Sequence, residues 1–292
     1  MSAGASPRVA FQGERGAYSE DAILARWGSA ARPVPARENL DVALAVERGL
    51  ADYGVLAVEN TLAGSVVASY DALAATNVVV TGEIVIPIHH CLLAPAGATV
   101  ATLRSVESHP IALAQCRRFL AAHPHVEPRA SYDTGGAARA VADRGDVTRG
   151  AIAGRAAAWH FELSVLATGI EDRPDNQTRF VVLAREPEPL AIGTPARTAL
   201  IVETDDVPGA LLRVLEPFAT AGLNLSKLES RPTGTPWAYR FFLELEHDAG
   251  DPAAARALDS LRAVTRSLRL LGSFARDDAA VMEPAMEERA HG

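Results

Sequence analysis

The chain has 292 residues, enough for a two-lobed unit plus a smaller module. Its composition, 48% hydrophobic and 22% charged, is typical of a globular protein, and the formal net charge of -8 argues against nucleic-acid binding as its main function. The two cysteines, Cys91 and Cys116, exclude a disulfide framework and a cysteine-rich metal centre, so we expect a reducing, cytoplasmic location.

Residues 1–16 lack the long apolar segment of a signal peptide, and apolar runs such as 78–80 are too short to span a membrane, so we expect no membrane partner. Over residues 7–185, short β-like runs alternate with Ala- and Leu-rich segments of helical composition around residues 21–27, 40–49, 111–122 and 137–143. The β-like runs read RVAFQG, YGVLAVEN, NVVVTGEIVIPIHHCLLA, RSVESHP, GAIAG and QTRFVVLAR. This alternation predicts an α/β domain with largely parallel sheets.

Four of the β-like runs lead into a turn that is rich in glycine or hydroxyl residues and is followed by helical sequence. These turns read GERGAYSEDA, ENTLAGSVVASYDAL, SYDTGGAARAVA and IAGRAAAW. Helix N-termini expose unpaired N–H groups, glycine lets a ligand approach the backbone, and such turns gather at the carboxyl ends of strands. Each turn alone reads as an ordinary N-cap. Together they favour two lobes that face each other across a ligand-binding cleft.

A proline-rich segment, residues 184–197, separates this domain from a different pattern. Beyond it, RTALIVETDD, LNLSKLESRP, WAYRFFLELEH and SLRLLGSF read as strands. PGALLRVLEPFATAG and the segment opened by Asp251 and Pro252 read as helices. The order βαββαβ over residues 197–275 predicts a ferredoxin-like sandwich with a regulatory or dimerising role. We expect the acidic residues 276–292 to form a disordered tail.

The motifs along the chain resemble those of one family, prephenate dehydratase with a C-terminal ACT regulatory domain. They are, in order, FQGERGAYSE, VENTLAGSV, HHCLL, SHPIALAQC and NQTRF, and in the last domain PGALLRVL with GLNLSKLESRP. The resemblance implies a two-lobed, periplasmic-binding-protein-like catalytic domain with an interlobe cleft, followed by an ACT domain. It also implies an enzyme that converts prephenate to phenylpyruvate, water and carbon dioxide in phenylalanine biosynthesis, without a redox cofactor or a metal.

The stretch NQTRF opens the last strand of the first domain, and the resemblance assigns the central chemistry to it. Thr178 matches the family threonine that gives a proton or a hydrogen bond to the departing hydroxyl group. A threonine hydroxyl is a weak acid in water, so it needs a dry, oriented site. Arg179 either crosses the cleft to a substrate carboxylate or pairs with Asp172 or Asp175, and the nearby aspartates favour the structural role.

Further polar positions match the family motifs one by one. The resemblance implies substrate-binding roles for Glu59, Asn60, Thr61, Ser108, Gln115, Arg179, Ser19 and Thr134, of which the last two also suit simple N-capping. Ser108 and Gln115, seven residues apart across a helix start, are expected on one face, and Ile111 stands where the family often has Gln. We expect His89 and His90 to be a buried, hydrogen-bonded pair outside the catalytic set, and both cysteines to be small core residues.

In the last domain, the segments around GALL and ESRP match the family motifs that bind phenylalanine at a subunit interface. The implied effector residues are Gly209, Ala210, Leu211, Asn224, Glu229, Ser230, Arg231 and Pro232. Gly209 at a helix N-terminus can receive the carboxylate of the amino acid, and Leu211 can border its ring. The expected consequence is allosteric regulation by phenylalanine in a homodimer or homotetramer.

Two alternatives remain open at the level of sequence. The same fold can act on arogenate, which carries an amino group where prephenate has its side-chain keto group, and no residue that we identify separates the two substrates. A two-lobed α/β cleft is also how non-catalytic ligand-binding modules are built. The intact NQTRF motif and the absence of a signal peptide favour the enzyme.

Overall fold

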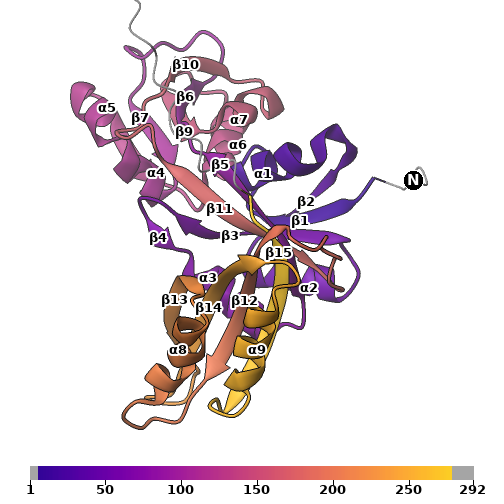
Figure 1. The fold of residues 1–292 in the computed structure, drawn as a ribbon. Coiled ribbons are helices and arrows are strands. Elements are labelled where there is room, and N and C mark those ends of the chain that lie inside the picture. Colours follow the sequence, from indigo (N-terminus) through magenta and orange to yellow (C-terminus); the bar gives the residue numbers. More distant parts are fainter. Residues whose placement is uncertain (1–5, 278–292) are drawn as a thin grey trace, which may run out of the picture.

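The computed structural model describes residues 6–277, which form one sheet in each of two lobes and a third sheet in a C-terminal domain (Figure 1). The elements of lobe 1 are β1 (Arg8–Gln12), α1 (Tyr18–Trp27), the short 3-10 helix η1 (Gly28–Ala30), β2 (Arg32–Ala36), α2 (Asn39–Glu47), β3 (Tyr53–Asn60), β4 (Gly64–Ser65), α3 (Val67–Ala75), β5 (Val79–Pro87) and β11 (Gln177–Ala184). Its sheet has the order β2-β1-β3-β11-β5, with β4 paired to β3.

Lobe 2 holds the middle of the chain. Its elements are β6 (Cys91–Ala94), β7 (Ser105–Ser108), α4 (Pro110–Gln115), α5 (Arg117–Ala122), β8 (Glu127–Ala130), α6 (Thr134–Arg144), β9 (Arg149–Ala153), α7 (Arg155–His160) and β10 (Ser164–Thr168). The sheet order is β10-β6-β9-β7-β8. Parallel pairing is limited to β1 with its two neighbours and β7 with its two neighbours, so the expectation of largely parallel sheets is only half right.

The chain crosses between the lobes twice, and these crossings explain the mixed sheets. The β-like run from residue 77 to residue 94 reads as one strand but is divided at residues 88–90, so that β5 stays in lobe 1 and β6 begins lobe 2. The second crossing returns the chain as β11, which pairs antiparallel with both β3 and β5. The two-lobed α/β domain is confirmed.

The C-terminal domain has the predicted order βαββαβ. Its elements are β12 (Pro195–Glu203), α8 (Ala210–Thr220), β13 (Asn224–Pro232), β14 (Tyr239–Asp248), α9 (Pro252–Leu261) and β15 (Ser267–Ala275), with the sheet order β13-β14-β12-β15. Asp251 caps α9 by accepting a hydrogen bond from the Ala253 N–H at 2.7 Å, and Pro252 supplies the fixed φ of the first helical turn. The ferredoxin-like sandwich is confirmed.

The sheet of the C-terminal domain lies between the helices of that domain and lobe 1. Val214 and Phe218 of α8 pack on one face of its sheet. The other face contributes Ile201 and Phe242 to an apolar core shared with Val181 of β11. Burial of this face in an interdomain core makes the C-terminal domain an integral neighbour of the strands that carry Thr178 rather than a tethered module.

The C-terminal domain approaches lobe 1 closely at Gly272 of β15, which has a φ of +150°. A Cβ atom at this position would lie 2.1 Å from the backbone oxygen of Val80 in β5. Because the neighbouring atom is backbone and cannot rotate away, only glycine fits here.

Gly272→Ala should therefore lower the free energy of unfolding by about 2 kcal/mol or more, because the added methyl group must push β15 away from β5. Gly193→Ala is the matched control, since Gly193 also has a positive φ, +82°, but a Cβ there meets nothing within 4 Å. Urea denaturation of both variants measures the difference. Equal losses of stability would mean that backbone strain, and not the contact with β5, accounts for the glycine.

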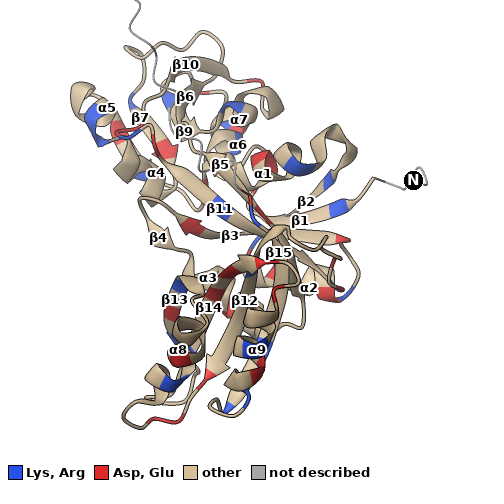
Figure 2. Ribbon diagram, in the orientation of Figure 1, with Lys and Arg blue, Asp and Glu red and all other residues tan. Residues whose placement is uncertain are grey.

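Within residues 6–277, no helix is long and apolar enough to cross a membrane. Figure 2 shows Lys and Arg interspersed with Asp and Glu along the elements of all three sheets. The expected tail, residues 276–292, lies outside the described residues except for its first two. Of these, Arg276 donates its backbone N–H to Pro195 at 3.0 Å, and the Asp277 carboxylate accepts from the Val85 N–H at 2.9 Å, so both contact the folded chain.

Candidate active site

Four of the residues expected in the site meet in one cluster between the lobes. Thr178 is 9% exposed, and its Oγ1 accepts a hydrogen bond from the Asn60 amide nitrogen at 2.9 Å. Gln115, reaching over from lobe 2, donates to the Asn60 amide oxygen at 3.4 Å. Thr61 accepts the Gln177 N–H at 3.0 Å through its hydroxyl oxygen. We refer to Asn60, Thr61, Gln115, Asn176 and Thr178 as the Thr178 cluster.

The ladder between β3 and β11 places these side chains. Thr178 is the register partner of Asn60, so their side chains lie on the same face of the sheet. The Asn60 oxygen also accepts the N–H groups of Leu62 and Ala63, at 3.1 and 2.9 Å, which ends β3 in a tight turn and fixes the amide. Asn176 is fully buried and accepts from the Asn60 amide at 2.8 Å, a role that its place at the head of NQTRF could have suggested.

Glu59 and Arg179 lie on the opposite face of the sheet, which corrects their expected role in substrate binding. Neighbouring residues of a strand point to opposite faces, so Arg179 turns away from the Thr178 cluster. The register runs from Arg179–Glu59 to Phe180–Ala57 and leaves Val58 as a bulge. Arg179 does not pair with Asp172 or Asp175 either; its structural role rests on other partners.

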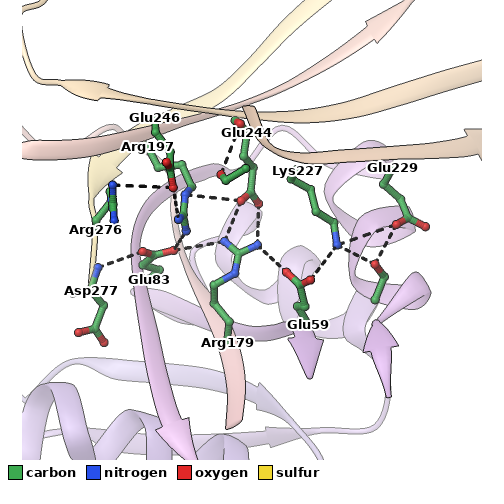
Figure 3. Close-up of polar contacts among 12 residues, drawn as sticks. Glu59, Glu83, Arg179, Arg197, Lys227, Glu229, Glu244, Glu246, Arg276 and Asp277 are labelled. Carbon is green, nitrogen blue, oxygen red and sulfur yellow. Dashed lines mark hydrogen bonds and ion pairs between the residues drawn. The ribbon is translucent and has the colours of Figure 1, made fainter. Parts of the chain in front are cut away.

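These partners form an ion-pair cluster between lobe 1 and the C-terminal domain (Figure 3). We refer to its members as the interdomain ion-pair cluster: Glu59, Glu83, Arg179, Arg197, Lys227, Glu229, Glu244, Glu246 and Arg276. The Arg179 guanidinium lies 2.9 Å from Glu244, 3.2 Å from Glu83 and 3.2 Å from Glu59. Burial alone would lower the pKa of Arg179, but the carboxylates of Glu244 and Glu83 raise it.

The expected residues Ser108, Ser19 and Thr134 do not join the Thr178 cluster. Ser108 is fully buried and donates to the Ile152 carbonyl oxygen at 2.5 Å, so its hydroxyl is used inside lobe 2. Ser19 and Thr134 lie in the first turns of α1 and α6. These helix starts approach each other where the Glu14 N–H donates to the Asp133 carboxylate at 3.2 Å.

The two histidines have different environments. His90 is 1% exposed and lies 2.9 Å from the Gln115 amide oxygen and 2.7 Å from the Tyr18 hydroxyl. His89 has 57% of its side chain exposed and pairs with Glu171 at 2.9 Å. The expectation of a buried pair therefore holds for His90 and is wrong for His89. The contacts of His90 with Gln115 and of Tyr18 with His90 could not be predicted from the sequence, because they depend on how the crossing between the lobes is folded.

The two cysteines are buried and unpaired. Burial raises the pKa of the Cys91 thiol and raises that of Cys116 to about 12, so both stay protonated at neutral pH. This agrees with their expected role as small core residues.

A cavity of about 690 Å³ opens between the lobes beside Tyr18. Asp21 of α1 and Arg155 and Trp159 of α7 line it, together with His89. Burial, followed by the charge of the neighbouring Glu20, raises the pKa of Asp21 to about 7. In the described part of the chain, no three His, Cys, Asp or Glu side chains are grouped so that they could hold a metal ion.

The expected effector residues divide between the two faces of the C-terminal sheet. Gly209, with a φ of +80°, precedes α8, and Ser230 pairs with Phe241, which packs on the α8 side. Glu229 and Arg231 instead point to lobe 1, where Glu229 accepts from Ser65 at 2.8 Å and Arg231 pairs with Asp71 at 3.1 Å. Their side chains therefore do not belong to an effector pocket beside α8.

The remaining expected positions surround the start of α8 and the ends of β13. Ala210 is buried, Leu211 is half-buried and Pro232 is exposed. Asn224 is exposed and donates to the Glu246 carboxylate at 2.9 Å. A site beside α8 thus retains Gly209, Ala210, Leu211 and Ser230 as candidates.

Comparisons with known proteins agree with this architecture. Residues 9–188 match the family model of prephenate dehydratase, and residues 198–263 match that of the ACT domain. Arogenate dehydratase 2 of Petunia hybrida is 40% identical over 290 residues, a match that covers 94% of this chain and 73% of that protein.

Two solved structures are similar over most of their length. The prephenate dehydratase of Arthrobacter aurescens in complex with L-Phe has a TM-score of 0.85 and 32% identity, covering 95% of this chain and 92% of that chain. A protein described as GqqA, a novel type of quorum quenching acylase, has a TM-score of 0.85 and 33% identity, covering 92% and 98%. With both family models matched in order, this chain belongs to the prephenate dehydratase family and carries a C-terminal ACT domain.

Proposed function

We propose that this chain converts prephenate to phenylpyruvate, water and carbon dioxide, with Thr178 as the proton donor. The observation that carries the proposal is the hydrogen bond from Asn60 to the Thr178 oxygen at 2.9 Å. Because Oγ1 accepts this bond, the hydroxyl hydrogen remains available for a substrate. Asn60, Thr61 and Gln115 complete a polar surface that can orient the substrate.

In the reaction, the ring carboxylate of prephenate leaves as carbon dioxide, and the electron pair of the broken C–C bond enters the ring. The ring becomes aromatic as the C–O bond to the hydroxyl group breaks, and that group takes a proton and departs as water. One proton is consumed overall. Thr178 supplies the proton at the leaving oxygen, while the Asn60 N–H stabilises the negative charge that develops on Oγ1.

Arogenate is a second candidate substrate, favoured by the 40% identity to the arogenate dehydratase of Petunia hybrida. The leaving groups are the same as in prephenate, so the proposed role of Thr178 does not depend on the choice. The discriminating measurement is phenylpyruvate formation from prephenate beside phenylalanine formation from arogenate. If neither substrate is turned over, the proposal is rejected. The acylase activity named for the similar structure, GqqA, would then be the next to test.

For the ACT domain we propose phenylalanine as the allosteric effector, bound beside α8 in a homodimer or homotetramer. The similar structure from Arthrobacter aurescens contains L-Phe, which supports phenylalanine as the ligand. The positive φ of Gly209 at the start of α8 supports a backbone site for the phenylalanine carboxylate. β13 is an edge strand, which supports pairing between subunits. Two free, buried cysteines support the proposed cytoplasmic location.

Ser230→Ala should raise the phenylalanine concentration for half-maximal inhibition by about tenfold, the effect of losing one hydrogen bond to a charged group, and should leave uninhibited kcat unchanged. Inhibition curves for prephenate turnover measure this change. Ser226→Ala is the control, because Ser226 is also an exposed serine of β13. A loss of kcat without a shift in the inhibition curve would contradict the effector assignment.

A further inference from the structure

A chain of hydrogen bonds continues from the Thr178 cluster to two residues with no assigned role, His90 and Tyr18. We propose that His90 and Tyr18 are positioning residues that hold the Gln115 amide with its NH₂ group toward Asn60, and that they thereby reinforce the Asn60 orientation that leaves the Thr178 hydroxyl hydrogen free. The proposal rests on the proposed role of Thr178, which it deepens.

The chain passes from lobe 1 to lobe 2 and back. The Tyr18 hydroxyl of α1 lies 2.7 Å from His90 Nδ1, and His90 Nε2 lies 2.9 Å from Gln115 Oε1. Gln115 Nε2 lies 3.4 Å from Asn60 Oδ1, and Asn60 Nδ2 lies 2.9 Å from Thr178 Oγ1. Each link joins two segments that are distant in the sequence, so the chain forms only when both lobes and the first crossing between them are in place.

The donor and the acceptor of every hydrogen bond in the chain follow from Asn60, whose orientation is fixed. The backbone N–H groups of Leu62 and Ala63 can only donate, so the atom of Asn60 that faces them must be its oxygen. Gln115 must then present its NH₂ group to that oxygen and its own oxygen to His90. His90 therefore carries its hydrogen on Nε2.

With the hydrogen on Nε2, Nδ1 of a neutral His90 is an acceptor, and the Tyr18 hydroxyl is its donor. The same hydroxyl lies 2.9 Å from the His89 carbonyl oxygen, which can share the hydrogen. The Tyr18 ring meets the His90 ring edge-on at a centroid distance of 5.6 Å and limits its rotation. Burial lowers the pKa of His90, against smaller opposing contributions from Gln115 and Glu171, which keeps the ring neutral.

The alternative arrangement shows why orientation matters. If the Gln115 amide turned over, its oxygen would face the oxygen of Asn60, and two acceptors would meet without a hydrogen between them. Turning Asn60 would relieve this contact, but it would also set the Asn60 NH₂ group against the N–H groups of Leu62 and Ala63. The Asn60 oxygen would then face Thr178 and accept the hydroxyl hydrogen that the substrate needs.

The test uses substitutions that separate hydrogen bonding from packing. His90→Gln places an amide donor near the position of Nε2, whereas His90→Leu fills the space without a donor. We expect kcat to fall about a hundredfold in His90→Leu and about tenfold or less in His90→Gln, with KM changing little. Tyr18→Phe should lower kcat about tenfold, because the ring stays and only the donor is lost.

Tyr70→Phe is the matched control for Tyr18→Phe. Tyr70 is also buried, but its hydroxyl has no hydrogen-bond partner in the described part of the chain, so kcat should not change. Equal kcat in His90→Leu and His90→Gln, or kcat within twofold of wild type in Tyr18→Phe and His90→Leu, would overturn the proposal. An inactive wild-type protein would reject the proposed function instead.

A second readout does not depend on activity. ¹⁵N NMR of the histidine rings in the free protein should show His90 neutral, with its hydrogen on Nε2. In Gln115→Met, which removes the acceptor, the preference for this tautomer should weaken. The Nδ1–H tautomer in the wild-type protein, or no response to Gln115→Met, would contradict the proposed orientation of the chain.

Discussion

Thr178→Val should lower kcat for dehydration of prephenate by about a thousandfold, the contribution expected of a positioned general acid. Valine has nearly the shape of threonine, so the strand pairing of Thr178 with Asn60 should persist. KM should change little, because the lost interaction is made mainly to the departing hydroxyl group as the C–O bond breaks. Steady-state kinetics with prephenate measure both parameters.

Thr178→Ser distinguishes the contribution of the hydroxyl group from that of the methyl group. Serine keeps the donor and loses only a methyl group, so this variant should recover most of the activity that Thr178→Val loses. Unchanged phenylalanine binding and thermal unfolding in both variants would show that the fold is intact. If Thr178→Val were as active as Thr178→Ser, the proton would have to come from another group, and the proposed role of Thr178 would be withdrawn.

The sequence was sufficient to predict the elements of the C-terminal domain and most of those in the two lobes, because apolar periodicity and caps such as Asp251 act locally. It did not predict the strands β2, β8 and β10, and it gave the separate helices α4 and α5 as one helical segment, residues 111–122. It was not sufficient to predict where the run containing His89 and His90 breaks, since that run is equally apolar on both sides of the break. The break places β5 and β6 in different sheets. Because the two strands lie in different sheets, His90 between them contacts Gln115.

The expected site residues that share one face of the β3–β11 ladder lie together in the structure, whereas Glu59 and Arg179 lie on the other face. The motifs place Glu59 beside Asn60 and Arg179 beside Thr178, and alternation along a strand then sends one member of each pair away from the cleft. Which member faces the cleft depends on the bulge at Val58 and on the position of the C-terminal domain. Neither can be read from the motifs alone.

Arg179→Met should lower the free energy of unfolding by about 3 kcal/mol, the cost typical of removing one partner from a buried ion pair. The side chains of Glu83 and Glu244 are 2% and 7% exposed, so water cannot replace the lost guanidinium. Arg197 remains near both carboxylates and limits the loss. Urea denaturation measures this change in the free energy of unfolding. Arg129→Met is the control, because Arg129 pairs with Glu127 at 2.7 Å on the exposed surface and should have no measurable effect.

The decisive step is to add Glu244→Gln to Arg179→Met. Glutamine keeps the size of the side chain and removes the buried charge that Arg179→Met leaves unpaired, so the double variant should be more stable than the sum of the single losses predicts, by about 1–3 kcal/mol. Because Arg179 and Thr178 are neighbours on β11, weakening this contact with β14 should also lower kcat. Strict additivity of the two substitutions would mean that apolar packing around Phe242 holds the ACT domain against β11 and that the ion pair contributes nothing to the contact.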